Sequence, residues 1–151
     1  MKTIIPILVS LMFIGSTQSL FAQDASLEKA RQEVQKLTEK EQQAFSNGNC
    51  EVVLDLMSEN ITFYANGNPS PPREMIRKFC EKVPRPFKTP EQETLKYYPL
   101  NSETVYVVRT MEYTKNANTR IKEIVTKIWN MENGAWKIVH LHSTVKEIPL
   151  G

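Results

Sequence analysis

Two histidines near the C-terminal end of the chain, His140 and His142, have the spacing of residues that act together. They lie in a strand-like run, 135–146, where side chains two positions apart point to the same face of a sheet. An imidazole titrates near neutral pH, so either residue could serve as a general acid or base. The chain holds two histidines in all, which is too few ligands for a metal centre, so we expect no metal site and no cofactor. The alternative to catalysis is a pair of histidines that are hydrogen-bonded in the core or at an interface.

Arg109 is a candidate ligand-binding residue because it falls in an otherwise apolar row. Alternation along the run 104–113 puts it on one strand face with Val107. A buried guanidinium costs free energy unless it is paired or solvated. Two interpretations follow: Arg109 lines a pocket and binds a carboxylate, or it pairs permanently with a glutamate of the first helix, such as Glu39 or Glu41.

Lys127 is a second cation in an apolar row, since it shares a strand face with Val125 and Trp129. It either adds a positive charge to the same pocket or lies at the surface with its alkyl stem along apolar neighbours. Two cations in one pocket are enough to hold a single carboxylate.

The expected elements indicate an α+β domain. Apolar residues recur at three- and four-residue spacing over 27–45, which predicts an amphipathic helix. Asn49 is expected to cap a short helix over 51–58, and a short strand over 61–64 and a third helix after Ser70 follow. The remainder is predicted to be an antiparallel meander of four strands over 94–98, 104–113, 120–131 and 135–146, with a tight Asn133-Gly134 turn before the last.

The first 22 residues have the order of a secretory signal peptide: a positive start at Lys2, an apolar run over 4–14, and small residues that end at Ala22. We therefore expect a cleaved segment 1–22 and one domain over 24–148, periplasmic or secreted, with no membrane attachment after cleavage. Cys50 and Cys80 could then form a disulfide, and two buried thiols are the alternative. The net charge of +2 argues against a nucleic-acid partner.

Three stretches have the look of one known family: residues 31–49, the strand 105–113, and the terminal hairpin with its Trp-Lys-Ile-Val-His-Leu-His. The chain resembles the nuclear-transport-factor-2-like superfamily, which includes SnoaL-type cyclases and ketosteroid isomerases. Within it, the chain is most similar to the association (hub) domain of calcium/calmodulin-dependent protein kinase II. The resemblance implies a cone of three helices closed against a curved sheet, with a pocket inside. It implies no kinase activity, because the chain has no Gly-rich phosphate loop and no His-Arg-Asp loop.

The resemblance also implies which residues line the pocket. Arg109 matches a pocket arginine of the hub family, Lys127 stands where the family has a second, and Ser143 stands where it has a third. The predicted ligand-binding set is Arg109, Lys127, Ser143 and Tyr64. Isomerases of the superfamily use a pocket aspartate as base, whereas Asp55 is expected at the surface of the short second helix.

Two functions of different class follow. The first is a non-catalytic, exported homodimer or larger oligomer whose cone binds a small organic anion. Self-association is expected because the strand 104–113 carries apolar residues on both faces and the helices can bury only one. The second is a small isomerase, cyclase or dehydratase of the SnoaL kind with His140 or His142 as acid–base, and it requires an imidazole inside the cone.

Overall fold

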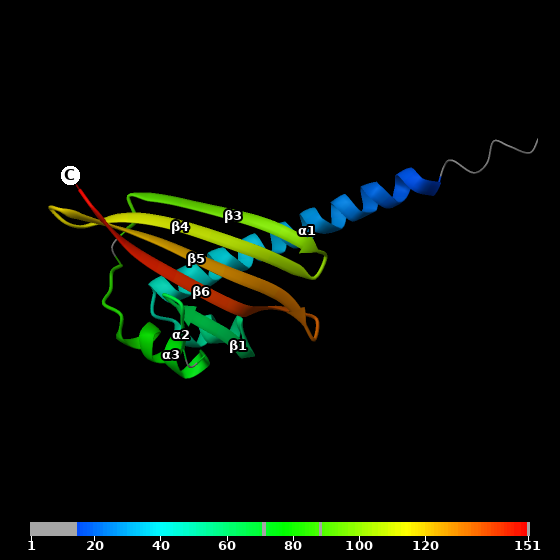
Figure 1. Ribbon diagram of the computed structural model, residues 1–151. Coiled ribbons are helices and arrows are strands. Elements are labelled where there is room, and N and C mark those ends of the chain that lie inside the picture. Colours follow the sequence, from blue (N-terminus) through cyan, green and yellow to red (C-terminus); the bar gives the residue numbers. More distant parts are fainter. Residues whose placement is uncertain (1–14, 71, 88, 151) are drawn as a thin grey trace, which may run out of the picture.

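Figure 1 shows a computed structural model of the chain, which describes residues 15–70, 72–87 and 89–150. The helices pack on one curved, unclosed sheet, so the predicted α+β class and the order of helices before a meander are confirmed. The elements of these residues are α1 Gly15–Ser46, α2 Cys50–Asp55, β1 Met57–Ala65, β2 Asn68–Ser70, α3 Pro72–Lys82, β3 Gln92–Asn101, β4 Thr104–Asn116, β5 Thr119–Glu132 and β6 Ala135–Pro149.

The sheet has the strand order β2-β1-β6-β5-β4-β3. All neighbours are antiparallel except β1 and β6, which run parallel. The four predicted meander strands are present, and each extends beyond its predicted range or matches one end of it. Asn133 and Gly134 have φ angles of 52° and 80°, the left-handed pair that a two-residue hairpin turn requires. The predicted turn between the last two strands is therefore confirmed.

The helix α1 is longer than the apolar stripe that predicted it. Its most buried side chains are Ala30, Val34, Thr38, Glu41 and Ala44, which lie on one helical face. Gly48, with φ of 76°, follows the end of α1, where a left-handed residue is favoured. Residues 1–14 of the predicted signal segment lie outside the described residues. Within the described ranges, no helix is both long and apolar enough to cross a membrane.

The predicted helix over 51–58 is wrong at its C-terminal end, because α2 ends at Asp55 and β1 begins at Met57. Met57 pairs in parallel with Ile138 of β6, and the Ile138 amide donates to the Leu56 carbonyl at 2.8 Å. This pairing with a distant strand overrides the local apolar pattern. Asn49 does occupy the position before α2, but its side chain makes no capping hydrogen bond.

Cys50 and Cys80 form a disulfide that joins α2 to α3. Cys80 is fully buried. The guanidinium of Arg85 lies beside it and donates to the Cys80 carbonyl at 2.6 Å and to the Phe45 carbonyl at 3.1 Å. Because carbonyls at helix C-termini lack partners within the helix, Arg85 holds the ends of α1 and α3 together next to the disulfide.

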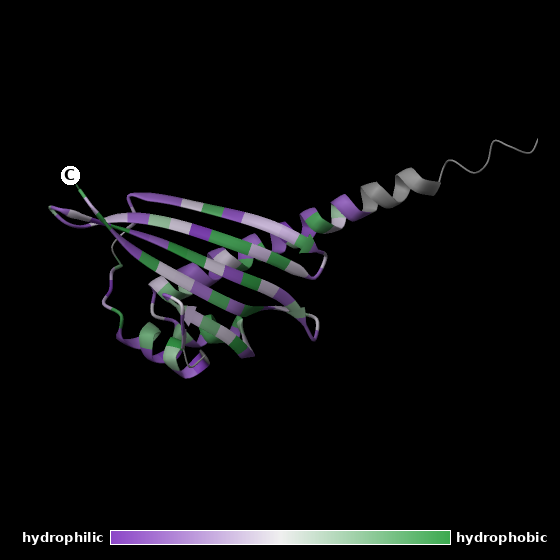
Figure 2. Cartoon of the chain, viewed as in Figure 1, coloured by the Kyte–Doolittle hydropathy of each residue, from purple (hydrophilic) through white to green (hydrophobic). Residues whose placement is uncertain are grey.

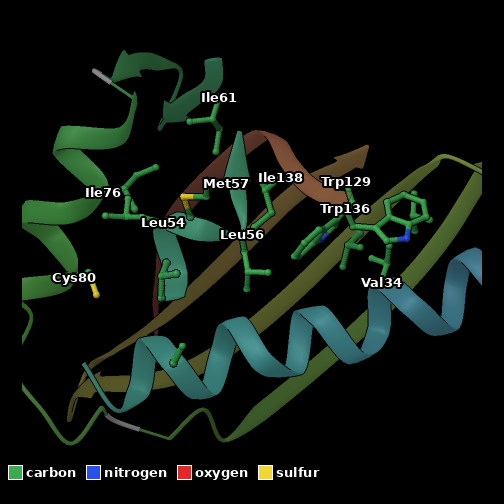
Figure 3. Close-up of a cluster of buried hydrophobic side chains, with 14 of the residues drawn as sticks. Val34, Leu54, Leu56, Met57, Ile61, Ile76, Cys80, Trp129, Trp136 and Ile138 are labelled. Atoms are coloured by element: carbon green, nitrogen blue, oxygen red, sulfur yellow. The ribbon is translucent and has the colours of Figure 1, made fainter. Parts of the chain in front are cut away.

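Alternation gives the sheet two different faces, as the changing hydropathy along the strands in Figure 2 shows. The inner face points to the helices and carries Val105, Val107, Trp129 and Ile138, each at most 2% exposed. Figure 3 shows Trp129 beside Val34 of α1 in this core. The other face is called the outer face here. Its three central cross-strand rows, the outer-face rows, are Tyr98–Tyr106–Ile128–His140–Thr62, Lys96–Val108–Thr126–His142–Tyr64 and Thr94–Thr110–Ile124–Thr144.

Candidate functional site

Three of the four predicted ligand-binding residues lie together on the inner face. Arg109 of β4 and Ser143 of β6 occupy one cross-strand row, on either side of Val125 of β5. Lys127 is two positions along β5 from Val125 and so points to the same side. Tyr64 pairs with His142 in the parallel β1–β6 register and lies on the outer face. The predicted set is therefore divided between the two faces of the sheet.

Lys127 forms a buried ion pair with Glu41 of α1. The Nζ and Oε2 atoms are 2.5 Å apart, and the two side chains are 10% and 8% exposed. We predicted such a pair for Arg109, but it is Lys127 that has it, because α1 crosses the sheet with Glu41 facing β5. Breaking a buried pair by removing one member leaves an uncompensated charge in a dry environment. The pair therefore acts as a polar attachment of α1 to the sheet.

Arg109 has a different partner, Glu93 on the neighbouring strand β3. The Nε and Oε1 atoms are 2.5 Å apart, and the side chains are 26% and 32% exposed. In the β3–β4 register Arg109 lies opposite Leu95, so the contact with Glu93 is diagonal, which is within reach of long side chains. The Arg109–Glu93 pair is thus open to solvent on one side, unlike the pair between Lys127 and Glu41.

Glu123 is a member of this cluster that the sequence analysis missed. It accepts a hydrogen bond from the Ser143 hydroxyl at 2.7 Å. Burial raises the pKa of Tyr113, and the negative charge of Glu123 adds to that rise. The signal for Glu123 was available, because it alternates with Val125 and Lys127 on one strand face.

The inner-face cluster, defined as Glu41, Glu93, Arg109, Glu123 and Lys127, holds three carboxylates against two cations. Each cation already has a carboxylate partner. An arriving organic anion would have to displace one of these carboxylates, and it would meet Glu123 nearby. The exposed Arg109–Glu93 pair is the weaker point, because solvent-exposed ion pairs contribute little.

Both histidines lie on the outer face, in the central rows. His140 Nδ1 is 2.7 Å from the Thr62 hydroxyl, and His142 Nε2 is 3.4 Å from the Thr144 hydroxyl. The Tyr64 ring centroid is 6.1 Å from that of His140 and 6.4 Å from that of His142. The enzyme alternative required an imidazole inside the cone, and neither histidine is there. Asp55 is exposed at the end of α2, as expected.

Two depressions lie on the described surface, and neither histidine lines them. One, of about 250 Å³, is lined at the β3 end of the sheet by Glu93 of the inner-face cluster and by Thr110, Glu112 and Lys122, among others. The second, of about 290 Å³, lies beside the middle of α1 and is lined in part by Lys29, Glu33 and Glu103. Among the described residues, no group of three or more His, Cys, Asp and Glu side chains is arranged to hold a metal ion.

The family model of calcium/calmodulin dependent protein kinase II association domains matches residues 30–147. The chain belongs to this family. The match runs from Ala30 of α1 to Glu147 of β6. It therefore contains both the inner-face cluster and the outer-face rows. No curated protein matches this association-domain chain in sequence.

Solved structures agree with the family. The association domain of the C. elegans kinase is 20% identical, with a TM-score of 0.59, and the match covers 78% of this chain and 97% of that one. The hub homology domain from Chlamydomonas reinhardtii is 17% identical, with a TM-score of 0.56 and coverage of 78% and 98%. A nuclear-transport-factor-2-like protein from Cytophaga hutchinsonii is 18% identical, with a TM-score of 0.59 and coverage of 77% and 98%. These likenesses confirm the predicted fold.

We expect Lys127→Met and Glu41→Gln each to lower the free energy of unfolding by roughly 3–5 kcal/mol, because each leaves a buried charge unpaired. The double variant Glu41→Leu/Lys127→Met should recover most of that loss. Arg109→Met and Glu93→Gln are the matched controls in the exposed pair and should cost less than about 1 kcal/mol. Urea unfolding followed by circular dichroism measures all of them. Equal losses at the two pairs would contradict the assignment of Lys127–Glu41 as the buried attachment.

Proposed function

We propose that the protein is an exported module that self-associates through the outer face of its sheet. The family supports self-association, since the matched model describes association domains. The outer-face rows carry the proposal: they hold aromatic, aliphatic, threonine and histidine side chains, and Lys96 at the β3 end is their one permanent charge. Tyr64, Tyr98 and Ile124 there are 40%, 45% and 40% exposed.

A second copy of the chain is the partner that fits this surface. The helices cover the inner face of the sheet, which leaves the outer-face rows bare in a single chain. A two-fold axis would bring the same rows of two copies together, so that two surfaces with few charges face each other. The threonine and tyrosine hydroxyls keep such a face soluble before association and provide hydrogen bonds after it.

Export is proposed from two independent features. One is the order of charged, apolar and small residues over 1–22. The other is the Cys50–Cys80 disulfide, because disulfides persist in oxidising compartments and are rare in the cytosol. The periplasm or the extracellular space provides such conditions.

Binding of a small organic anion is a second candidate function. It is supported by the position of Arg109, Lys127 and Ser143 on neighbouring places of the inner face. A ligand carboxylate would replace Glu93 at Arg109, since that pair is the solvent-exposed one. Lys127 would contribute less, because Glu41 holds it in a buried pair.

Export predicts the covalent form of the protein. When the full chain is expressed with its N-terminus intact in bacteria, we expect periplasmic protein that begins near Gln23 and contains the Cys50–Cys80 disulfide. Intact-mass spectrometry before and after reduction and alkylation reports the cleavage position and the disulfide together. Protein that keeps Met1, or that alkylates at both cysteines without reduction, would contradict this prediction.

Self-association predicts a selective effect of charge on the outer face. Ile124→Lys should turn a dimer into a monomer at micromolar concentration, because it buries an unpaired ammonium in the contact. Met75→Lys is the matched control, since Met75 on α3 is 42% exposed and Ile124 is 40% exposed, but Met75 lies on the helical side. Light scattering with size exclusion measures the mass. A wild-type monomer, or a dimer that Ile124→Lys leaves intact, would refute the proposed interface.

Anion binding predicts that a carboxylate stabilises the wild type and not Arg109→Met. Thermal melts in acetate, butyrate, succinate and glutarate should show a rise in Tm for at least one compound. The variant should lose roughly 2–5 kcal/mol of binding free energy and with it the rise. Lys96→Met removes a cation from the outer face and should keep the response. If none of the four compounds moves the wild-type Tm, the anion site is absent from Arg109.

A further inference from the structure

We infer that self-association through the outer face is pH-sensitive, with His140 and His142 as the sensing groups. This inference rests on the proposed function, because it needs the outer-face rows to be covered by a second copy. It adds a property that the interface alone does not require: the dimer should weaken as the solution becomes mildly acidic.

His140 and His142 lie in two adjacent central rows, on β6, with β1 on one side and β5 on the other. Both are partly exposed, so solvent reaches them in a single chain. A two-fold contact over these rows would take both imidazoles of each copy out of water.

The residues that face the two histidines from the neighbouring strands carry no permanent charge. From β5 the facing residues are Ile128 and Thr126, and from β1 they are Thr62 and Tyr64. Of these four, Tyr64 alone carries an ionisable group, a phenol hydroxyl. Neither carboxylate nor cation occupies these facing positions, so a protonated imidazole would find no countercharge there.

The surrounding charges are distant or already bonded. Lys137 of β6, in the row next to that of His140, donates to the Asp55 carbonyl. Lys96 shares the row of His142 but lies on β3, three strands away. Glu112 is two rows further along and pairs with Lys122 at 3.0 Å and Arg120 at 3.7 Å. Lys146 is two alternating positions beyond His142 on β6. The charges nearest to the histidines on their own face thus include cations, which oppose a further positive charge.

The neutral form suits a covered surface. His140 Nδ1 already shares a hydrogen bond with the Thr62 hydroxyl, which a neutral imidazole makes in either tautomer. Protonation would place a positive charge on a surface from which association removes water. The two-fold axis would place the same charges of the second copy opposite those of the first. Association must therefore expel protons from the imidazoles whenever the pH is low enough to add them.

The size of the effect follows from proton linkage. A histidine in water titrates near pH 6.5. If one imidazole of each copy has to be neutral in the dimer, lowering the pH from 7.5 to 5.5 costs about tenfold per copy and raises the dimer Kd about 100-fold. The sign is fixed: association is strongest above pH 7 and is lost as the pH falls. The chain has no other histidine, so no other side chain ordinarily titrates in this window.

The test is the dimer Kd of the full chain, exported and purified, at pH 7.5, 6.5 and 5.5 and constant ionic strength. Fluorescence-detected sedimentation provides the Kd, and circular dichroism at each pH checks that the chain stays folded. The variant His140→Asn/His142→Gln keeps hydrogen-bonding groups but cannot gain charge. We expect about 100-fold weakening for the wild type and no pH dependence for the double variant. Lys96→Met, which removes a positive charge from the row of His142 and leaves both imidazoles in place, should keep the dependence.

The outcomes separate this inference from the proposed function. A dimer that Ile124→Lys disrupts and whose Kd is unchanged between pH 7.5 and 5.5 overturns the inference and leaves the interface in place. Weakening that persists in the double variant also overturns it, since other groups would then be responsible. A chain that is monomeric at pH 7.5 overturns the interface itself and the inference with it.

Discussion

The three helices of the described residues cover one face of the six-stranded sheet and leave the other bare, and the rest of this structure depends on that constraint. Side chains alternate along each strand, so every strand serves two environments at once. On β4, Val105 and Val107 are 0% and 2% exposed, whereas their neighbours Tyr106 and Val108 stay partly exposed on the outer face. The inner face is completed by the chain itself. The outer face is left uncovered by the helices of the described residues.

Polar side chains that lie under a helix need a partner, because a buried polar group without one costs free energy. Lys127 is buried, and Glu41 of α1 is buried with it. Eight residues earlier, on the same side of α1, Glu33 accepts a hydrogen bond from the Trp136 indole at 2.9 Å. These two contacts attach α1 to β5 and β6 at two points, with the apolar Val34 packed between the helix and the sheet. Lys127 and Glu41 therefore fix the helix on the sheet, whereas Arg109 and Glu93 pair between two strands.

Local patterns predicted the faces of the strands but not the partners across the fold. Alternation is local, so the inner positions of Arg109 and Lys127 followed from the sequence. That Glu41 pairs with Lys127 depends on where α1 crosses the sheet, and no pattern within either element specifies this. The same holds for the start of β1: residues 53–57 are apolar enough for a helix, and pairing with β6 decides in favour of a strand at Met57. Tyr64 lies on the outer face because β1 pairs in parallel with β6, and no local pattern specifies this pairing either.

The two faces also differ in the ionisable groups that they carry. The inner face holds the ion pairs Lys127–Glu41 and Arg109–Glu93. Both histidines lie on the other face, which the helices leave bare. The proposed response to pH therefore concerns a different surface from the one on which Lys127 and Glu41 hold α1. In this fold the alternation of strand side chains separates the charges that attach the helix from the groups of the proposed interface.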